Sequence, residues 1–143
     1  MNAIGSLESN PDRFRELFHA IVTQLSKQQT RLAIWAIEDF DLSQFKYQII
    51  GSNSPFKDSN SKLAGDGILI NLDPTQVEAL TDTLEPGLGS SILHMEIEAN
   101  GSVQFSAYDG MLYAVFGNEI SLDLLEDLKA SEAIYNYEIV KPE

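Results

Sequence analysis

The chain has 143 residues, no cysteine and a formal net charge of −13, because 22 acidic side chains outnumber nine lysines and arginines. Without cysteine there is no disulfide framework, no thiolate nucleophile and no metal site with cysteine ligands. The strong negative charge argues against direct binding to nucleic acids or anionic membrane surfaces, because both carry charge of the same sign.

Apolar residues make up 43% of the chain and charged residues 22%, values that are typical of globular proteins. We therefore expect a single folded domain over residues 1–143 with one sizeable core. The first residues show no basic segment followed by an apolar run, and no stretch reaches about 18 consecutive apolar residues. These patterns predict a cytoplasmic protein that has no membrane partner and no membrane-spanning segment.

The N-terminal region predicts one helix after a short frayed end at residues 1–8. Asn10 followed by Pro11 is typical of a helix start, because asparagine caps the free N–H groups and proline fits the first helical position. Apolar residues then recur at three- and four-residue spacing to about Gln28. This spacing predicts an amphipathic helix with one buried face.

Two strands and a long loop are expected next. Residues 32–37 are apolar on both faces, which indicates a central strand with Trp35 in the core. Residues 45–49 alternate between apolar and polar, which indicates a half-exposed strand. Its inward side chains would be Phe45, Tyr47 and Ile49. Gly, Ser, Asn and Asp are frequent in residues 51–67, which predicts a long mobile loop.

A short strand and a second helix follow the loop. Residues 68–72 are mostly apolar and predict the strand. Asp73 and Pro74 are a typical helix start, and Pro86 with Gly87 indicates where the helix stops.

Two turn dipeptides, Asn100-Gly101 and Asp109-Gly110, lie between alternating runs and predict a three-stranded meander. A three-residue first loop would pair Ile97 with Val103, whereas the second loop is expected to have two residues. One face of the meander is then apolar. The other face carries a mixed set of side chains: His94, Glu96, Glu98, Ser106, Tyr108, Met111, Tyr113 and Val115.

The last elements are a third helix and a final strand. Ser121 is a typical cap for the helix. Its buried side would consist of Leu122, Leu125 and Leu128. Residues 134–140 alternate as a strand does, and residues 141–143 are expected to form a frayed end.

The resulting order of elements is α-β-β-β-α-β-β-β-α-β. Because strands follow one another through short turns and helices come singly, this order predicts an α+β fold with a mainly antiparallel sheet covered by helices. In topology, size and charge the chain resembles type III secretion chaperones and some toxin-immunity proteins. The likeness assigns no role to any single residue.

The acidic residues are concentrated in the second half of the chain. Seven acids balance seven bases before Leu63, whereas twelve acids and no lysine or arginine lie between Leu63 and Leu128. This segregation favours a basic protein partner, which charge would steer while aromatic side chains supply contact area. Our leading hypothesis is a non-enzymatic module that docks a basic protein, as an inhibitor, immunity protein or chaperone does. The predicted partner-binding residues are His94, Glu96, Glu98, Tyr108, Tyr113, Asp123, Glu126 and Asp127.

The main rival hypothesis is a small enzyme or metal-dependent module around His94. His94, Glu96 and Glu98 are metal-ligand types at alternate strand positions, but a sheet displays them in parallel, and a solvated polar face is the simpler interpretation. His94 is expected opposite Ser106, as in an activated serine, but a flat sheet offers no oxyanion hole. We therefore assign no catalytic, cofactor or metal-binding residue.

Three further features have simple interpretations. Glu38, Asp39 and Asp41 could hold Mg²⁺, but a solvated turn is the simpler interpretation. Residues 87–91 are rich in glycine and serine, yet they precede a strand and lack the lysine of a phosphate-binding loop. His19 lies beside the apolar stripe of the first helix and is interpreted as structural. The acidity could also lack any electrostatic partner, and a homodimer is left open.

Overall fold

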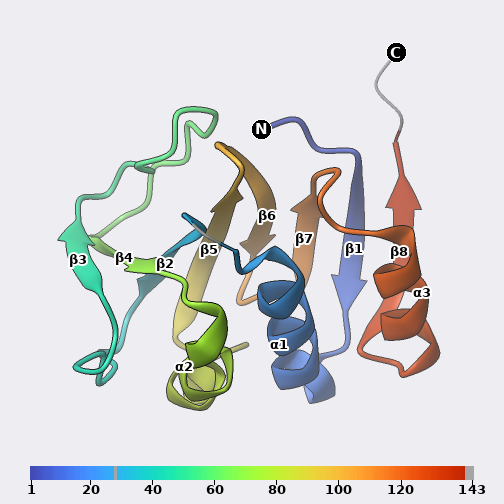
Figure 1. Cartoon of the computed structure of the whole chain (residues 1–143), viewed down its shortest axis with the longest axis horizontal. Helices are drawn as coiled ribbons and strands as arrows, with labels where there is room; N and C mark the ends of the chain where they lie inside the picture. The colour runs from blue at the N-terminus through green and yellow to red at the C-terminus, as the bar shows by residue number, and fades with distance from the viewer. Residues whose placement is uncertain (28, 141–143) are drawn as a thin grey trace.

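The computed structural model describes residues 1–27 and 29–140, and within them the chain forms eight strands and three α-helices. The strands are β1 (Gly5–Ser9), β2 (Arg31–Ala36), β3 (Tyr47–Ile50), β4 (Gly67–Asn71), β5 (Ile92–Ala99), β6 (Ser102–Tyr108), β7 (Tyr113–Phe116) and β8 (Ile134–Ile139). The helices are α1 (Phe14–Leu25), α2 (Val77–Leu84) and α3 (Leu122–Ala130). The strands form one antiparallel sheet of order β3-β4-β2-β5-β6-β7-β1-β8, which confirms the predicted α+β class (Figure 1).

All three helices lie on the same face of the sheet (Figure 1). In α1 the apolar stripe is buried: Leu17, Phe18, Ile21, Val22 and Leu25. These side chains pack in the main core with sheet residues such as Ile34, Met95 and Phe105. Because the hydrophobic effect scales with the apolar area removed from water, this layer supplies the main driving force for the fold.

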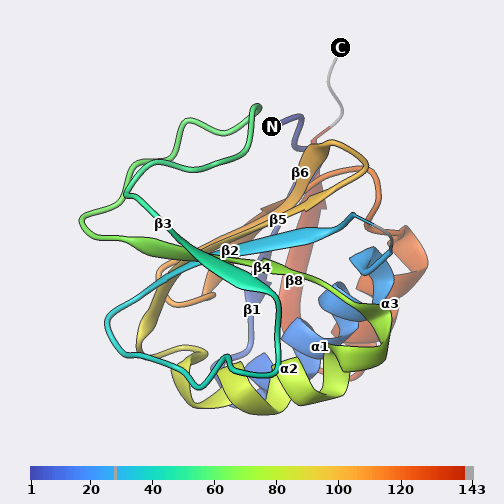
Figure 2. The same ribbon diagram turned by 60° about the vertical axis from the view of Figure 1, so that its left-hand side comes forward.

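The opposite face of the sheet is covered only in part. The loop of residues 51–66, which joins β3 to β4, lies on the side away from the helices (Figure 2). Its Phe56 is buried in a second, smaller apolar cluster with Ala33, Trp35, Leu69 and Val103. The predicted loop is therefore present, and it packs on the sheet.

The start of the chain differs from expectation. The frayed end predicted at residues 1–8 is wrong, because Gly5–Ser9 forms β1 between β7 and β8 inside the sheet. Leu7 is the one large core side chain of this strand. The apolar alternation that marks a strand is therefore weak here, and pairing with both neighbours stabilises the segment instead.

Helix α1 is preceded by a 3₁₀ turn at Pro11–Arg13, with Asn10 as the cap, as predicted. The helix ends at Leu25, where the N–H of the next residue still bonds to the last turn. The predicted end near Gln28 and the predicted frayed end at residues 141–143 lie outside the described residues.

Strand β3 is an edge strand and faces water more than predicted. Phe45 is buried just before the strand, but Tyr47 and Ile49 are 50% and 73% exposed, so their expected inward orientation is wrong. Both residues pair with β4 at the edge of the sheet, where β3 lies beyond the helices (Figure 1).

The first hairpin of the meander closes through a two-residue turn, so the predicted three-residue loop is wrong. Asn100 and Gly101 have positive φ angles of 55° and 81°, as a type I′ turn requires. A β-bulge in β6 then restores the alternation, and Ile97 pairs with Phe105 instead of Val103.

The second hairpin has a four-residue loop instead of the predicted two, because Tyr108 pairs with Tyr113. Asp109, Gly110 and Met111 all have positive φ angles in this loop. The loop turns Met111 into the main core, so its expected place on the polar face is wrong.

Helix α3 begins at the predicted cap, where the Ser121 hydroxyl accepts the N–H of Leu124 at 3.1 Å. Leu125 and Leu128 are buried as predicted, whereas Leu122 is exposed. Within the described ranges, no helix is both long enough and apolar enough to span a bilayer.

Candidate functional site

Strand β5 places His94, Glu96 and Glu98 on the face opposite the helices, as predicted. The three side chains are only 5%, 2% and 8% exposed, so the expected solvated polar face is wrong. The loop of residues 51–66 covers Glu96, while His94 is enclosed by Trp35 and Tyr108 and Glu98 is paired with Arg31. We call this part of the face the covered half. In this conformation Glu96 cannot touch a partner.

The Glu96 carboxylate is held by three serine hydroxyls of the covering loop. Ser54 donates to Oε1 at 2.6 Å, and Ser59 and Ser61 donate to Oε2 at 2.5 and 3.0 Å. A buried carboxylate needs such donors, because its transfer from water into the protein costs free energy unless new hydrogen bonds replace those to water. These three donors could not be predicted from the sequence. The serines lie in a loop 35 to 42 positions before Glu96, and no local pattern links them to it.

The loop serines also explain the ionisation of Glu96. Burial alone would raise the pKa of the Glu96 carboxyl, but hydrogen bonds from His94 and the three serines outweigh it and hold the pKa at about 2. Glu96 is therefore a charged carboxylate at neutral pH, sealed beneath the loop.

His94 lies between two aromatic rings beside this carboxylate. The ring centres of Trp35 and Tyr108 are 5.5 and 5.0 Å from that of His94. The Nε2 atom of His94 is 3.4 Å from Oε2 of Glu96. The imidazole is thus aimed at the carboxylate.

Ser106 does not face His94, so the Ser-His arrangement expected from the sequence is wrong. The register places Ser106 opposite Glu96, because the β5–β6 turn and bulge differ from the prediction. Ser106 is 1% exposed, and its hydroxyl has no hydrogen-bond partner within the described chain. The activated-serine hypothesis is therefore not supported, because it required Ser106 to lie opposite His94.

Other contacts also hold the loop on the covered half. Arg31 of β2 donates to Glu98 at 2.7 Å, and its guanidinium lies 5.3 Å from the ring centre of Phe56 in the loop. The Asp58 carboxylate accepts the backbone N–H of Val103 in β6, at 3.0 Å to one oxygen. These contacts join loop and sheet through charge, hydrogen bonding and aromatic packing.

On β6, β7, β1 and β8 the same face is open to solvent, and we call it the open half. Tyr108 and Tyr113 pair across β6 and β7 and are 42% and 48% exposed. Tyr113 also pairs with Glu8 of β1. A shallow depression of about 280 Å³ is lined here by Ser6, Leu7, Glu8, Tyr108, Tyr113, Ala114, Val115, Asn136, Tyr137 and Glu138. Among the described residues, this lining contains carboxylates and tyrosines but no lysine or arginine.

The remaining predicted residues lie on the other side of the molecule. Asp123, Glu126 and Asp127 are exposed on α3, in the helical layer. Glu126 accepts a hydrogen bond from the hydroxyl of Tyr137, which raises the pKa of that tyrosine. The eight predicted residues therefore fall into three sets: three on the covered half, two on the open half and three on α3.

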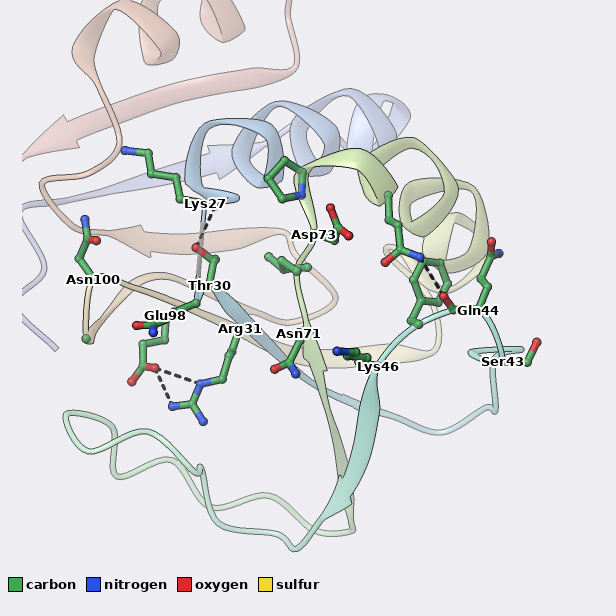
Figure 3. Close-up of a pocket in the computed structure, with 16 residues that line it drawn as sticks. Lys27, Thr30, Arg31, Ser43, Gln44, Lys46, Asn71, Asp73, Glu98 and Asn100 are labelled. Carbon is green, nitrogen blue, oxygen red and sulfur yellow. Dashed lines mark hydrogen bonds and ion pairs between the residues drawn. The ribbon is translucent and has the colours of Figure 1, made fainter.

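A further hollow was not predicted from the sequence. It is a groove of about 950 Å³ at one end of the strands, and its cationic side chains are Lys27, Arg31 and Lys46 (Figure 3). Asp73 and Glu98 also line it, so the charges are mixed. Its residues come from several loops and strand ends that are far apart in the sequence, so no local sequence pattern predicts that they lie together.

The minor candidates of the sequence have ordinary structural roles. Asp41 accepts hydrogen bonds from Ser43 in a turn, and His19 is 2.9 Å from the Glu78 carboxylate on α2. The segment 87–91 forms turns before β5. Within the described ranges, no three histidine or acidic side chains come together as a metal site.

Comparison with known proteins gives no relative for this arrangement. No protein-family model, no curated protein and no solved structure matches the chain.

Proposed function

We propose that this protein is a non-enzymatic binding module whose open half docks a basic protein partner. One observation carries the proposal: the open half exposes two tyrosines beside carboxylates, and none of the described residues that line it is a cation. An inhibitor, an immunity protein or a chaperone would use such a surface. We also propose a cytoplasmic location.

The side chains of the open half suit this role because each type supplies a different part of binding. Tyr108 and Tyr113 offer rigid contact area, which is typical of the centre of an interface. Glu8 and Glu138 add negative charge at the rim, where it steers a basic partner and speeds association. The net charge of −13 strengthens this long-range attraction.

The acids on α3 are a weaker surface for the same partner. Glu126 is bonded to Tyr137, and Lys129 lies on the same helix near the ring of Tyr137. The tyrosine that Glu126 contacts, Tyr137, is half-buried and offers less ring area to a partner than Tyr108 and Tyr113 do. We therefore place the α3 acids outside the surface that contacts the partner. Variants of these acids serve as the matched control for variants of the open half.

The alternative of an enzyme around His94 has less support. His94 is buried between two rings, and Ser106 faces Glu96 instead. The further alternative, acidity with no electrostatic partner, is decided by the experiment below.

The test is a pull-down from native lysate at low and high salt with two charge-reversal variants. The variant Glu8→Lys/Glu138→Lys alters the open half, and Glu126→Lys/Asp127→Lys alters α3 by the same charge. We expect wild type and the α3 variant to retain a basic protein at low salt, and the open-half variant to lose it. The retained protein is then purified and its direct binding measured.

Equal loss in both variants would indicate attraction to net charge alone, and loss only in the α3 variant would move the site to the helical layer. A wild-type protein that retains nothing basic at low salt contradicts the proposed function.

A further inference from the structure

The open and covered halves are one continuous surface of the sheet. A cross-strand row runs from β5 to β8 through five paired residues: Glu96, Ser106, Val115, Ser6 and Glu138. Only the first two are buried. A partner docked on the open half therefore lies in line with the Glu96 carboxylate, and the loop is what separates them.

We propose that Glu96 receives an arginine side chain of the basic partner, and that the loop of residues 51–66 is a cover that this arginine displaces. The inference rests on the proposed function. It adds that Glu96 is the residue that recognises the partner and that a guanidinium is the group it recognises.

The atoms around Glu96 match the donors of a guanidinium. Besides the two carboxylate oxygens, the hydroxyl of Ser106, which lies opposite Glu96 in the register, is buried without a hydrogen-bond partner among the described residues. Its oxygen can accept a hydrogen bond. A guanidinium brings five N–H donors in a planar fork together with a positive charge. It could donate to both the carboxylate and the Ser106 oxygen, whereas the three serine hydroxyls of the loop bond to the carboxylate alone.

The same face already binds one guanidinium in this way. Arg31 donates two hydrogen bonds to Oε1 of Glu98 and lies over the ring of Phe56. Glu96 lies on the same strand, with the rings of Trp35 and Tyr108 packed around the neighbouring His94. An incoming arginine would thus find a carboxylate and aromatic rings together, as Arg31 does.

The three serine hydrogen bonds from the loop to Glu96 are of a kind that a charged donor can replace. Neutral hydroxyl donors to a carboxylate are weaker than charged ones, so an arginine competes directly for Glu96. Trp35, the one tryptophan of the chain, reports the displacement, because its Nε1 donates to the carbonyl of Gly51 at the base of the loop. A partner that stays on the open half leaves this contact intact.

The experiment titrates the protein with fluorescent arginine and lysine octapeptides at low salt. Peptide anisotropy reports binding, and Trp35 emission reports the loop. We expect both peptides to bind, and only the arginine peptide to change the Trp35 emission. In Glu96→Gln this change is expected to vanish while anisotropy still reports binding to the open half.

A second variant weakens the cover and leaves its target in place. Ser59→Ala/Ser61→Ala removes two donors to Glu96. It should raise the apparent affinity for the arginine peptide by about 25-fold, which is about fivefold for each hydrogen bond lost. The control Ser52→Ala/Asn60→Ala lies in the same loop, makes no side-chain contact with Glu96 in the structure, and should behave as wild type. Thermal unfolding establishes that each variant is folded.

Each outcome decides between the two proposals. A binding arginine peptide that leaves Trp35 emission unchanged overturns this inference and leaves the proposed function standing. The inference is also overturned if Glu96→Gln keeps the full Trp35 response, or if the serine and control variants bind equally. If neither peptide binds wild type at low salt, both proposals fail.

Discussion

The covered and open halves lie on the same face of one sheet, yet they treat polar groups in opposite ways. The covered half buries the ionised Glu96 and packs His94 between the tilted rings of Trp35 and Tyr108. The open half leaves Tyr113 and its neighbour Glu8 in contact with water. One loop, residues 51–66, makes the whole difference.

The comparison shows that strand alternation alone does not distinguish a surface site from a buried one. Glu96 lies between the core residues Met95 and Ile97, and Glu8 follows the core residue Leu7, so both carboxylates lie on the face away from the main core. Their environments differ because a loop 35 to 42 positions before Glu96 supplies three serine donors to Glu96 and none to Glu8. Whether the loop packs over a carboxylate therefore decides whether that carboxylate is buried or faces water.

Removing the apolar anchor of the loop should have the largest effect on stability. Phe56→Ala is expected to cost about 4 kcal/mol, because Phe56 is buried against Trp35 and Val103 and its loss leaves a cavity or an open loop. Urea unfolding measures the change, and Trp35 emission should shift toward that of a solvated indole. A loss below about 1 kcal/mol would mean that the loop contributes little to the fold.

Glu96→Gln should have the next largest effect on stability. It tests the hydrogen bonds between loop and sheet separately from the apolar packing of Phe56. We expect a loss of about 2 kcal/mol at pH 7, because the amide bonds less strongly to the three serine hydroxyls than the carboxylate does. Thermal or urea unfolding of variant and wild type at the same pH gives the difference.

The same variant has a defined pH dependence. The folded pKa of Glu96 is about 2, below its ordinary value of 4.5, so the carboxylate stabilises the fold fully above about pH 4.5. That contribution is lost as the pH falls from about 4.5 to about 2, and the difference between wild type and Glu96→Gln should shrink over this window. A difference that stays constant down to pH 2 would contradict the low pKa.

A smaller effect is expected at the tip of the cover. Asp58→Asn weakens the charged hydrogen bond to the N–H of Val103 and removes attraction to the Met1 ammonium, which is 3.8 Å away. We expect a loss of about 1 kcal/mol by urea unfolding. Asp66→Asn, an exposed acid in the same loop, removes the same charge and should change the stability by less than about 0.5 kcal/mol.

Much of the fold follows from local patterns in the sequence. Apolar spacing in α1, the Ser121 cap and the two turn dipeptides all predict elements that the structure contains. Strand β1 did not follow, because Leu7 alone gives no periodic signal and the strand depends on pairing with β7 and β8. The hairpin registers failed because the bulge in β6 lets a two-residue turn keep the core side chains on one face.

The candidate site was predictable only in part. The shared face of His94, Glu96 and Glu98 follows from alternation, and so does the placement of Tyr108 and Tyr113 on that face. The cover over Glu96 does not follow, because it depends on contacts between a loop and a sheet that are distant in sequence. Loop composition predicts that a loop exists, but not which surface it packs on.

The smallest effect on stability should come from the open half, where we expect binding to change instead. Tyr113→Ala removes an exposed ring and should cost less than about 1 kcal/mol of stability, but it should weaken binding of the pulled-down basic partner at least about tenfold, as loss of a central interface tyrosine does. The matched control is Tyr47→Ala on the edge strand β3, because Tyr47 is 50% exposed and Tyr113 is 48% exposed. Calorimetric titration of both variants measures the affinity. Equal affinities would show that an exposed tyrosine of the open half matters no more than one at the sheet edge, and the functional distinction between the two halves would then fail.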